Sequence, residues 1–590
     1  MDNETIEKRK PGRVGLIIFI VVVILVILGV ILLIAGFSSL TKGPQIKVKP
    51  NSTLVIDLNK PLQEQPADPL STQFFGAKVI QFCQLHDALK RAKDDDRIKS
   101  VLILPSMIPM SLAKAQELKN DIDELKKSKK VYAYFDMTGN TGYYIASSAE
   151  KIYAPPSAML FLSGFYSEIP FLRGTFDKLK IEPQLYHIGD YKSASDMFMR
   201  KDMSEAQKEA TEAVLDSFYK NLVGGICQGG RFNETELRSI IDKGMQTGPF
   251  LKESKLIDDF KYRYDVEDEL KAINGTKENL NKIDISSYIR DKRAIFETKS
   301  KNAIAVIIAN GDIVDDSAAK SDNISPSKFN KLLDKAEKDK EVKAIILRVD
   351  SPGGSGLASD VIWEKINRVK KVKPVIVSMS SVAGSGGYYI SMNADAIVAE
   401  PTTITGSIGV ITGKIVIKGL TDWAGVGWGF IKKGENADLF SELQTFTPEQ
   451  EKIIVGQMEN FYKDFVTKAA QGRKMTYEQI DKIGQGRIWS GEDALKIGLV
   501  DKLGGLDEAI ELAKEKAKIP SSEKVKIKYL PGQKTLFEFF SEMGNEDMTS
   551  TFIKVAMPKI YDDLRKQSSL LKILSDNKNL YYTPVEIKSN

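Results

Sequence analysis

The chain has 590 residues, of which 42% are hydrophobic and 28% are charged. This length suggests two or more domains, and the globular composition excludes a largely disordered chain. The net charge of +5 arises from 84 basic and 79 acidic residues without a basic stripe, so it does not argue for nucleic acid as a partner. With two histidines and two cysteines, the sequence predicts neither a histidine-rich metal site nor a disulfide framework.

An apolar segment near the N-terminus predicts a membrane anchor. No charged residue lies between Val14 and Thr41, and residues 14–36 are long enough to span a bilayer as a helix. A cleaved signal peptide is the alternative, but its apolar region would be shorter, and IAGFSSL is a poor cleavage site. Residues 1–13, which contain four basic residues, then form a cytoplasmic tail, and the large remainder lies outside.

The rest of the chain is predicted to be an internal duplication. Residues 139–156 (GNTGYYIASSAEKIYAPP) align with residues 384–401 (GSGGYYISMNADAIVAEP) at an offset of 245. Three further pairs follow the same order at offsets of 244 or 243: IKSVLILP with VKAIILRV, FYKNLV with FYKDFV, and TGPFLKESKLIDD with SGEDALKIGLVDK. These matches predict two related repeats, residues 51–291 and 303–530, which are joined near residues 292–302.

Strands and helices are expected to alternate in both repeats, which predicts an α/β fold with right-handed crossovers. Six short runs rich in β-branched residues predict buried strands: residues 53–59, 99–105 and 130–136, and residues 303–309, 342–350 and 373–380. Residues 357–371 predict a helix with one apolar face, formed by Leu357, Val361, Ile362 and Ile366. Residues 531–590 match nothing in the other half, and we expect a helical extension there.

Two glycine-containing motifs follow strands of the second repeat. The sequence DSPGG ends at Gly354, and glycines at a strand end allow the backbone to approach a ligand, although they also mark plain turns. The sequence GSGGYY contains Ser385, whose flanking glycines allow a sharp turn from strand to helix. It is not the G-x-S-x-G nucleophile elbow, and a helix N-cap serine is the alternative interpretation.

Comparison of the repeats favours a catalytic role for the second motif. At the offset of 245, Ser385 corresponds to Asn140, while the following Tyr-Tyr-Ile is retained in both repeats. A serine hydroxyl is a weak nucleophile and needs a proton acceptor. Lys192, in the sequence GDYKSA of the first repeat, corresponds to Ala437 of the second. The first repeat has the lysine without the serine, and the second has the serine without the lysine. We therefore predict that the two repeats share one composite site.

Lys192 can accept a proton only if its pKa falls from about 10.4 toward the working pH. Desolvation can produce such a shift, whereas Asp190 and Asp196 would oppose it if they faced the amine, so we expect them to point elsewhere. One alternative is a solvated surface lysine at this position. The other is His187 as the base, although no carboxylate stands at an obvious spacing to orient it.

Taken together in this order, the motifs resemble the signal peptide peptidase A family of membrane-anchored serine–lysine peptidases, in its long two-repeat form. The motifs are GDYKSA in the first repeat and DSPGG, GSGGYY and TGSIGV in the second. The resemblance implies a Clp-protease/crotonase-like α/β fold in each repeat, with Ser385 as nucleophile and Lys192 as general base. It also implies that Gly354 and Gly386 offer N–H groups to an oxyanion, and that Ser407 helps to hold the lysine amine.

The resemblance also carries expectations about cell biology. It implies a single-pass homotetramer on the outer, periplasmic face of the bacterial cytoplasmic membrane, with no metal or cofactor. The expected reaction is endopeptidase cleavage of released signal peptides and other envelope peptides through an acyl-enzyme, with the peptide added as a strand to a sheet edge. Because a fold does not fix a function, an inactive membrane scaffold and a crotonase-type acyl-CoA enzyme remain alternatives.

Overall fold

The computed structural model describes residues 47–66, 79–105, 107, 110–291, 300–319 and 322–532, and the backbone of residues 580–582 and 588–589. The expected anchor, residues 14–36, lies outside these ranges, as do the cytoplasmic tail and the stretches of the C-terminal extension that we expected to be helical. Among the helices that are described, none combines the length and the apolar character needed to cross a bilayer.

The first repeat is built on a six-stranded parallel sheet with the order β12-β7-β5-β4-β1-β13. Its strands are β1 (Ser52–Asp57), β4 (Ile98–Leu104), β5 (Lys130–Tyr134), β7 (Lys151–Ala154), β12 (Asp259–Phe260) and β13 (Lys282–Asp284). The three strands predicted here correspond to β1, β4 and β5. Helices cover both faces of such a sheet, so its strands are continuous apolar runs rather than alternating ones.

The second repeat contains a larger sheet with the order β21-β19-β17-β15-β14-β23, to which β18 and β22 are attached. Its strands are β14 (Ala303–Asn310), β15 (Val342–Ser351), β17 (Val375–Gly384), β18 (Ala396–Ala399), β19 (Ile404–Gly406), β21 (Ile488–Ser490), β22 (Lys502–Leu503) and β23 (Lys526–Leu530). The predicted strands correspond to β14, β15 and β17. Both repeats therefore have the α/β architecture that the sequence predicted.

The helix predicted over residues 357–371 is α14 (Gly356–Lys370), but its apolar face differs from the prediction. Ile362 and Ile366 are buried, whereas Leu357 is 61% and Val361 42% exposed. The buried stripe begins instead with the small residues Ala358 and Ser359, because the first turn of the helix packs closely against backbone. Periodicity alone overestimated the width of the buried face.

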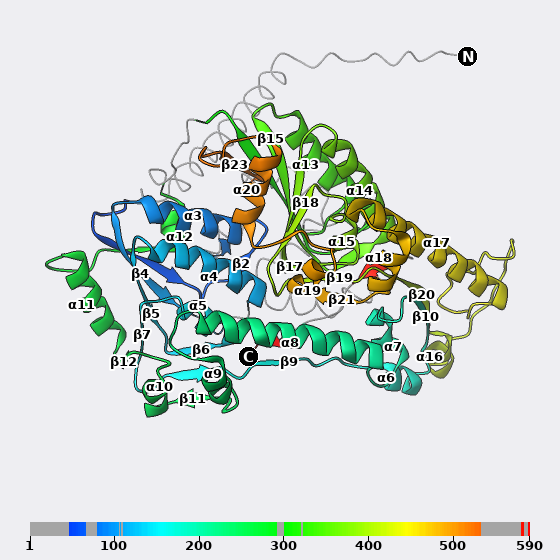
Figure 1. Cartoon of the computed structure of the whole chain (residues 1–590). Coiled ribbons are helices and arrows are strands. Elements are labelled where there is room, and N and C mark those ends of the chain that lie inside the picture. Colours follow the sequence, from blue (N-terminus) through cyan, green and yellow to red (C-terminus); the bar gives the residue numbers. More distant parts are fainter. Residues whose placement is uncertain are drawn as a thin grey trace, which may run out of the picture. The chain divides into compact units, whose positions relative to one another are not determined.

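Backbone pairing joins the two repeats. Strand β10 (Glu182–Ile188) of the first repeat pairs antiparallel with β20 (Val410–Val416) of the second over seven residue pairs (Figure 1). The sheet continues through β24 (Leu580–Tyr582) to β16 (Gly353–Ser355). The sequence predicted neither the C-terminal strand β24 nor β25 (Lys588–Ser589), which pairs with β9 (Phe165–Tyr166).

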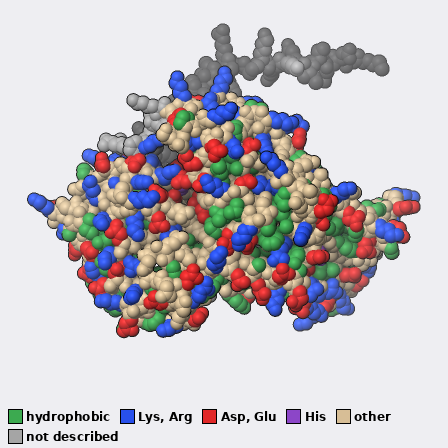
Figure 2. Space-filling model, in the orientation of Figure 1, with side chains coloured by type: hydrophobic (Ala, Val, Ile, Leu, Met, Phe, Trp, Pro, Cys, Tyr) green, Lys and Arg blue, Asp and Glu red, His purple; other side chains and the backbone are tan. Residues whose placement is uncertain are grey.

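Helices of the first repeat also reach the second. Helix α8 (Glu205–Cys227) places Ser217 and Lys220 against Glu492, at distances of 2.8 and 2.9 Å. Helix α4 (Leu112–Lys126) packs against β17. On the face shown in Figure 2, basic and acidic side chains are interspersed, as the balanced composition predicted.

The tight contact of β10 with β20 predicts a stability effect at Gly413. This residue has φ of 145°, and a Cβ atom there would lie 2.0 Å from the carbonyl oxygen of Gln184. We expect Gly413→Ala to lower the free energy of unfolding by about 1–3 kcal/mol, measured by denaturant or thermal unfolding. The matched control is Gly456→Ala in helix α17 (Pro448–Arg473), where a Cβ meets nothing within 4 Å.

Gly456→Ala places a Cβ in open space and improves the helix propensity. The free energy of unfolding of this control is therefore expected to rise by about 0.5–1 kcal/mol. Equal stability of the two variants would contradict the proposed constraint between the repeats.

Candidate active site

Ser385 lies at the turn between β17 and α15 (Gly386–Tyr389). Its backbone has φ of 54° and ψ of −115°, a conformation that side-chain-bearing residues rarely adopt. Its N–H donates to the carbonyl oxygen of Gly406 at 2.8 Å, which holds the turn. Ser385 occupies the N-cap position, but its hydroxyl makes no capping hydrogen bond. The hydroxyl thus remains available for another partner at the carboxyl end of the sheet.

Lys192 supplies that partner from the first repeat. It follows β10, and its Nζ lies 2.8 Å from Ser385 Oγ, 2.9 Å from Ser407 Oγ and 3.0 Å from the carbonyl oxygen of Ser407. Lys192 and Ser407 are each 1% exposed, and Ser385 is fully buried. The structure therefore brings together three of the five residues singled out in the sequence.

Donor and acceptor counting assigns the direction of one of these contacts. A neutral amine has two N–H donors and one lone pair, and the Ser407 carbonyl oxygen can only accept. One N–H therefore goes to the carbonyl oxygen of Ser407, while the hydroxyl groups of Ser385 and Ser407 can each donate or accept. The Lys192 amine thus lies within hydrogen-bond distance of the Ser385 hydroxyl.

Burial lowers the pKa of Lys192 well below its usual value. Neither aspartate beside it in sequence opposes this shift: Asp190 is exposed, and the Asp196 carboxylate accepts a hydrogen bond from Ser204 Oγ at 3.1 Å. Lys192 is thus not the solvated surface lysine of the alternative reading. His187, the alternative base, is exposed, and its Nδ1 lies 3.0 Å from the carbonyl oxygen of Gly189.

The two glycines expected at the oxyanion lie against one another beside Ser385. Gly354 is in β16, and Gly386 is the first residue of α15, where N–H groups have no partner within the helix. A Cβ at Gly386 would lie 3.2 Å from the nitrogen of Gly354. A Cβ at Gly354, whose φ is 147°, would lie 2.0 Å from the carbonyl oxygen of Ile313. A side chain at Gly354 would therefore require displacement of the backbone, and one at Gly386 would be tightly crowded.

Sequence reasoning missed the segment that encloses the lysine. A Cβ at Gly486 would lie 2.5 Å from Lys192 Cβ, and one at Gly409 would lie 3.0 Å from Lys192 Cδ. The N–H of Tyr191 donates to the carbonyl oxygen of Gln485 at 2.8 Å. The available signal was the pair of glycines in GQGR, residues 484–487. These contacts help to bury the lysine side chain, and burial lowers the pKa of its amine.

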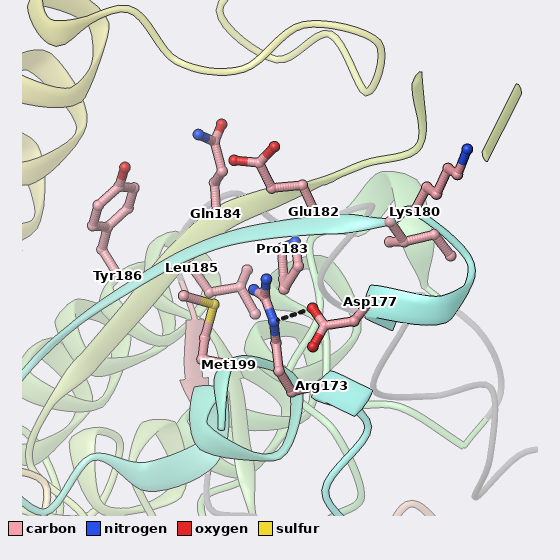
Figure 3. Close-up of a pocket in the computed structure, with 10 residues that line it drawn as sticks. Arg173, Asp177, Lys180, Glu182, Pro183, Gln184, Leu185, Tyr186 and Met199 are labelled. Carbon is pink, nitrogen blue, oxygen red and sulfur yellow. Dashed lines mark hydrogen bonds and ion pairs between the residues drawn. The ribbon is translucent and has the colours of Figure 1, made fainter. Parts of the chain in front are cut away.

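One cavity lies against β10, and a smaller one lies beside Lys192. The larger, of about 520 Å³, contains none of the three residues in contact at the site (Figure 3); it is lined by Arg173, Asp177, Lys180, Ile181, Glu182, Pro183, Gln184, Leu185, Tyr186 and Met199. The smaller, of about 10 Å³, is lined in part by Lys192, Ser407 and Gly486. Its size is at the lower limit for one water molecule.

One group of described residues has the composition of a metal site: His86, Asp121 and Asp507. Both ring nitrogens of His86 are already bonded, Nδ1 to Asp121 at 2.9 Å and Nε2 to Asp507 at 3.0 Å. Burial lowers the pKa of His86, but the two carboxylates outweigh it and raise that pKa well above its usual value. With both ring nitrogens of His86 bonded to carboxylates, these residues form a hydrogen-bonded cluster.

Comparison with known proteins assigns the chain to a family. The model described as Peptidase family S49 matches residues 123–277 and again residues 367–520. The chain belongs to peptidase family S49. Among its relatives, Serine protease SPPA, chloroplastic, of Arabidopsis thaliana is 35% identical over 84% of this chain and 73% of that protein. Protease 4 of Salmonella typhi is 34% identical over 79% and 78%, and Protease 4 of Haemophilus influenzae is 32% identical over 72% of each.

The two S49 matches confirm the resemblance inferred from the motifs and the internal duplication. Lys192 lies in the first matched segment, whereas Ser385 and Ser407 lie in the second. The pair in contact is therefore formed by one residue from each copy of the family domain.

The buried amine of this S49 chain predicts a pH-dependent stability. Below its lowered folded pKa, Lys192 imposes its full penalty on folding, and the penalty vanishes above the unfolded value of about 10.4. The free energy of unfolding of the wild type is therefore expected to rise between pH 7 and 10 relative to Lys192→Met, by up to about 1.4 kcal/mol per pH unit. Denaturant unfolding across this pH range measures the difference.

The control for loss of a positive charge is Lys208→Met, which removes an exposed lysine of α8. A difference between wild type and Lys192→Met that does not change with pH would show that the amine is protonated in the folded protein throughout this range.

Proposed function

We propose that this chain is a serine endopeptidase in which Ser385 is the nucleophile and Lys192 the general base. The observation that carries the proposal is the 2.8 Å contact between Lys192 Nζ and Ser385 Oγ, with both side chains buried. Burial lowers the pKa of the amine, which favours its neutral form at the working pH. The names of the relatives, a serine protease and two proteases, support hydrolysis of peptide bonds.

Acylation follows from this arrangement. Lys192 accepts the hydroxyl proton while Ser385 Oγ forms a bond to the carbonyl carbon of the scissile peptide. The N–H groups of Gly354 and Gly386 stabilise the resulting oxyanion, and loss of one such donor typically costs about 2.7–4 kcal/mol. When the C–N bond breaks, the leaving amine takes the proton from Lys192, and the acyl group remains on Ser385.

Deacylation uses the same base. Lys192 accepts a proton from a water molecule as its oxygen attacks the ester carbonyl, and Ser385 Oγ regains a proton as the ester bond breaks. Ser407 keeps the amine in place because its carbonyl oxygen accepts one N–H group and its hydroxyl lies 2.9 Å from Lys192 Nζ. The chemistry requires no metal or cofactor.

The substrate is proposed to bind as an added strand. β16, which contains Gly354, and β20 are bridged in the structure by the three residues of β24, through the pairs Gly354↔Tyr581 and Ile411↔Leu580. A polypeptide backbone therefore fits between these strands and next to Gly354. A substrate bound in this way would take the place of β24 and gain its backbone hydrogen bonds.

The proposed substrates are cleaved signal peptides and other short peptides of the bacterial cell envelope, as the resemblance implies. In this proposal, residues 14–36 anchor the chain in the cytoplasmic membrane, residues 1–13 remain inside, and both repeats lie on the outer face. The anchor would keep the site close to apolar segments released from the bilayer.

Assembly into a homotetramer is supported by an unpaired counterpart of β10. The offset of 245 that relates the repeats places β10 on residues 427–433, which form no strand and are exposed. Several large apolar side chains are exposed in and around this segment: Trp423, Val426, Trp428, Phe430 and Ile431. We propose that the segment docks on the first repeat of a second copy, which repeats the β10–β20 contact between chains and closes a ring.

Activity measurements test the dyad directly. We expect Ser385→Ala and Lys192→Met each to lower peptide cleavage by at least roughly 10³-fold, because neither the nucleophile nor its base can be replaced. A fluorophosphonate probe should label the wild type but not Ser385→Ala. Ser522→Ala, which removes an exposed serine, is the matched control.

Full activity in either dyad variant would overturn the proposed mechanism. A wild type that is neither labelled nor active on peptides would favour the inactive scaffold, and turnover of acyl-CoA esters would favour the crotonase-type enzyme.

The assembly is tested by light scattering after size-exclusion chromatography. We expect the full chain in detergent to have the mass of four copies, and a Trp428→Ser/Ile431→Ser double variant to shift to smaller species. Tyr264→Ser, which alters an exposed aromatic residue of helix α11 (Arg263–Asn274), is the control and should remain a tetramer. A monomeric wild type, or a double variant of unchanged mass, would contradict the proposal.

A further inference from the structure

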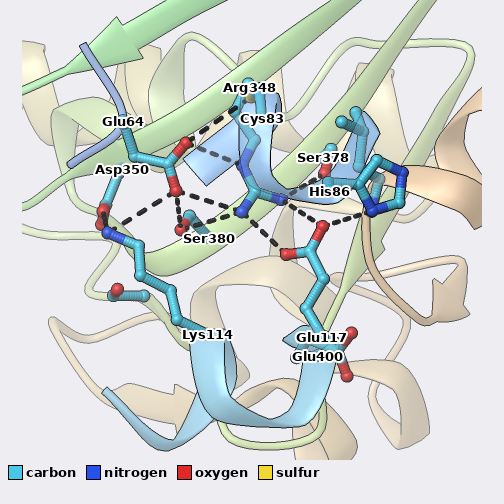
Figure 4. A network of polar contacts seen from close by, with 12 residues as sticks. Glu64, Cys83, His86, Lys114, Glu117, Arg348, Asp350, Ser378, Ser380 and Glu400 are labelled. Carbon is cyan, nitrogen blue, oxygen red and sulfur yellow. Dashed lines mark hydrogen bonds and ion pairs between the residues drawn. The ribbon is translucent and has the colours of Figure 1, made fainter. Parts of the chain in front are cut away.

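A buried polar cluster joins the repeats behind the catalytic strands (Figure 4). Its centre is Arg348 of β15, which is fully buried. The guanidinium donates to Glu117 Oε2 at 2.8 Å and to Glu64 Oε1 at 3.1 Å. Both carboxylates belong to the first repeat, Glu117 to α4 and Glu64 to the segment after β2 (Leu62–Gln63).

The cluster also contacts β17, the strand that ends next to Ser385. Arg348 donates to Ser378 Oγ at 3.0 Å and to Ser380 Oγ at 3.2 Å, and Ser380 Oγ donates to Glu64 Oε1 at 2.7 Å. One arginine thereby links β15, which leads to Gly354, with β17, which leads to Ser385.

A second ion pair continues the cluster toward the site. Lys114 Nζ donates to Asp350 Oδ2 at 2.8 Å, and Asp350 Oδ1 accepts from the N–H of Val382 at 3.1 Å. This contact spans the point at which the register between β15 and β17 shifts. Asp350 precedes Gly354 by four residues and Val382 precedes Ser385 by three, so the pair secures both strands just before the reactive groups.

The duplication indicates that the fold itself does not require this cluster. Ile103 pairs with Ala133 in the first repeat as Leu347 pairs with Val377 in the second. Leu104 of β4 therefore corresponds to Arg348 of β15, and Tyr134 of β5 corresponds to Ser378 of β17. Leu104 and Tyr134 pack in an apolar cluster with helix α11.

Charge balance shows that the cluster is a formed ion-paired unit. Burial alone would raise the pKa of Glu64, but the charges of Arg348 and Lys114 and two hydrogen bonds lower it to about 2. Glu117 Oε1 also accepts from the N–H of Leu506, at the start of helix α20 (Leu506–Lys516). Well-packed apolar residues are often as stable as a buried ion pair, so stability alone does not account for its presence in one repeat only.

We infer that Arg348 is a positioning residue for the reaction. Held by two carboxylates of the first repeat, it sets the spacing between the strands that carry the nucleophilic serine and the oxyanion glycine. The first repeat thus contributes both the base and the frame against which the second repeat is aligned. This inference rests on the proposed serine–lysine mechanism.

The test is a triple variant, Glu64→Gln/Glu117→Gln/Arg348→Met, which removes the three charges together and leaves no unpaired buried charge. Its amide oxygens can still accept from Ser380 and Leu506. We expect kcat per fluorophosphonate-titrated site to fall roughly 10- to 100-fold, because a misplacement near 1 Å can have an effect of that size. KM should remain within about threefold, and the midpoint of the pH–rate profile should not move, because Lys192 is untouched.

The single variant Arg348→Lys keeps the positive charge but loses the two-sided contact. Its kcat per titrated site is therefore expected to lie between those of the wild type and the triple variant. If the triple variant does not fold, this single variant provides the test. The matched control is Arg97→Met, which removes an arginine held by two carboxylates of the first repeat, Asp95 at 2.7 Å and Asp291 at 3.0 Å. Its kcat per titrated site should be that of the wild type.

A loss confined to the number of titrated sites, with full kcat at each, would overturn the inference and leave a structural role only. A shifted pH midpoint would also overturn it, because the cluster would then act through the lysine. Activity retained by Ser385→Ala would instead overturn the proposed function, which distinguishes the two failures.

Discussion

The antiparallel pairing of β10 with β20 is the constraint on which the active site depends. It places the residues after β10, and hence Lys192, against the turn that holds Ser385 and Ser407. Neither repeat contains both Lys192 and Ser385, so their contact forms only because the two copies share a sheet. Strand pairing is well suited to this task because its register fixes positions along both strands at once.

Two features of the site are energetically unfavourable, and the surrounding structure must offset them. Ser385 is held in a rarely populated backbone conformation, and Lys192 is buried without a carboxylate to stabilise its charged form. Both features serve the proposed chemistry: the turn brings the hydroxyl next to Gly386, and burial lowers the pKa of the amine. The glycines Gly409 and Gly486 allow the enclosing backbone to approach the stem of the lysine closely.

The two repeats have diverged in complementary ways around a common fold. The first retains the strand order but has Asn140 and Leu104 in the places of Ser385 and Arg348, and it supplies the lysine and the carboxylates instead. The second supplies Ser385, the proposed nucleophile, and the two glycines. The ion pairs of Arg348 with Glu64 and Glu117, and of Lys114 with Asp350, each join one repeat to the other. The first copy thus supplies the carboxylates that hold Arg348 of the second copy in place.

The sequence by itself determined the duplication, the α/β class, the central strands of each sheet and the candidate dyad, because buried parallel strands are continuous apolar runs and the repeats can be compared position by position. It could not predict that Leu357 and Val361 are exposed, that Gly486 encloses the lysine, or that the C-terminal extension pairs with β16. Only the tertiary structure decided these features, together with the contact between Lys192 and Ser385, since they depend on chain segments that are distant in sequence and on the packing between them.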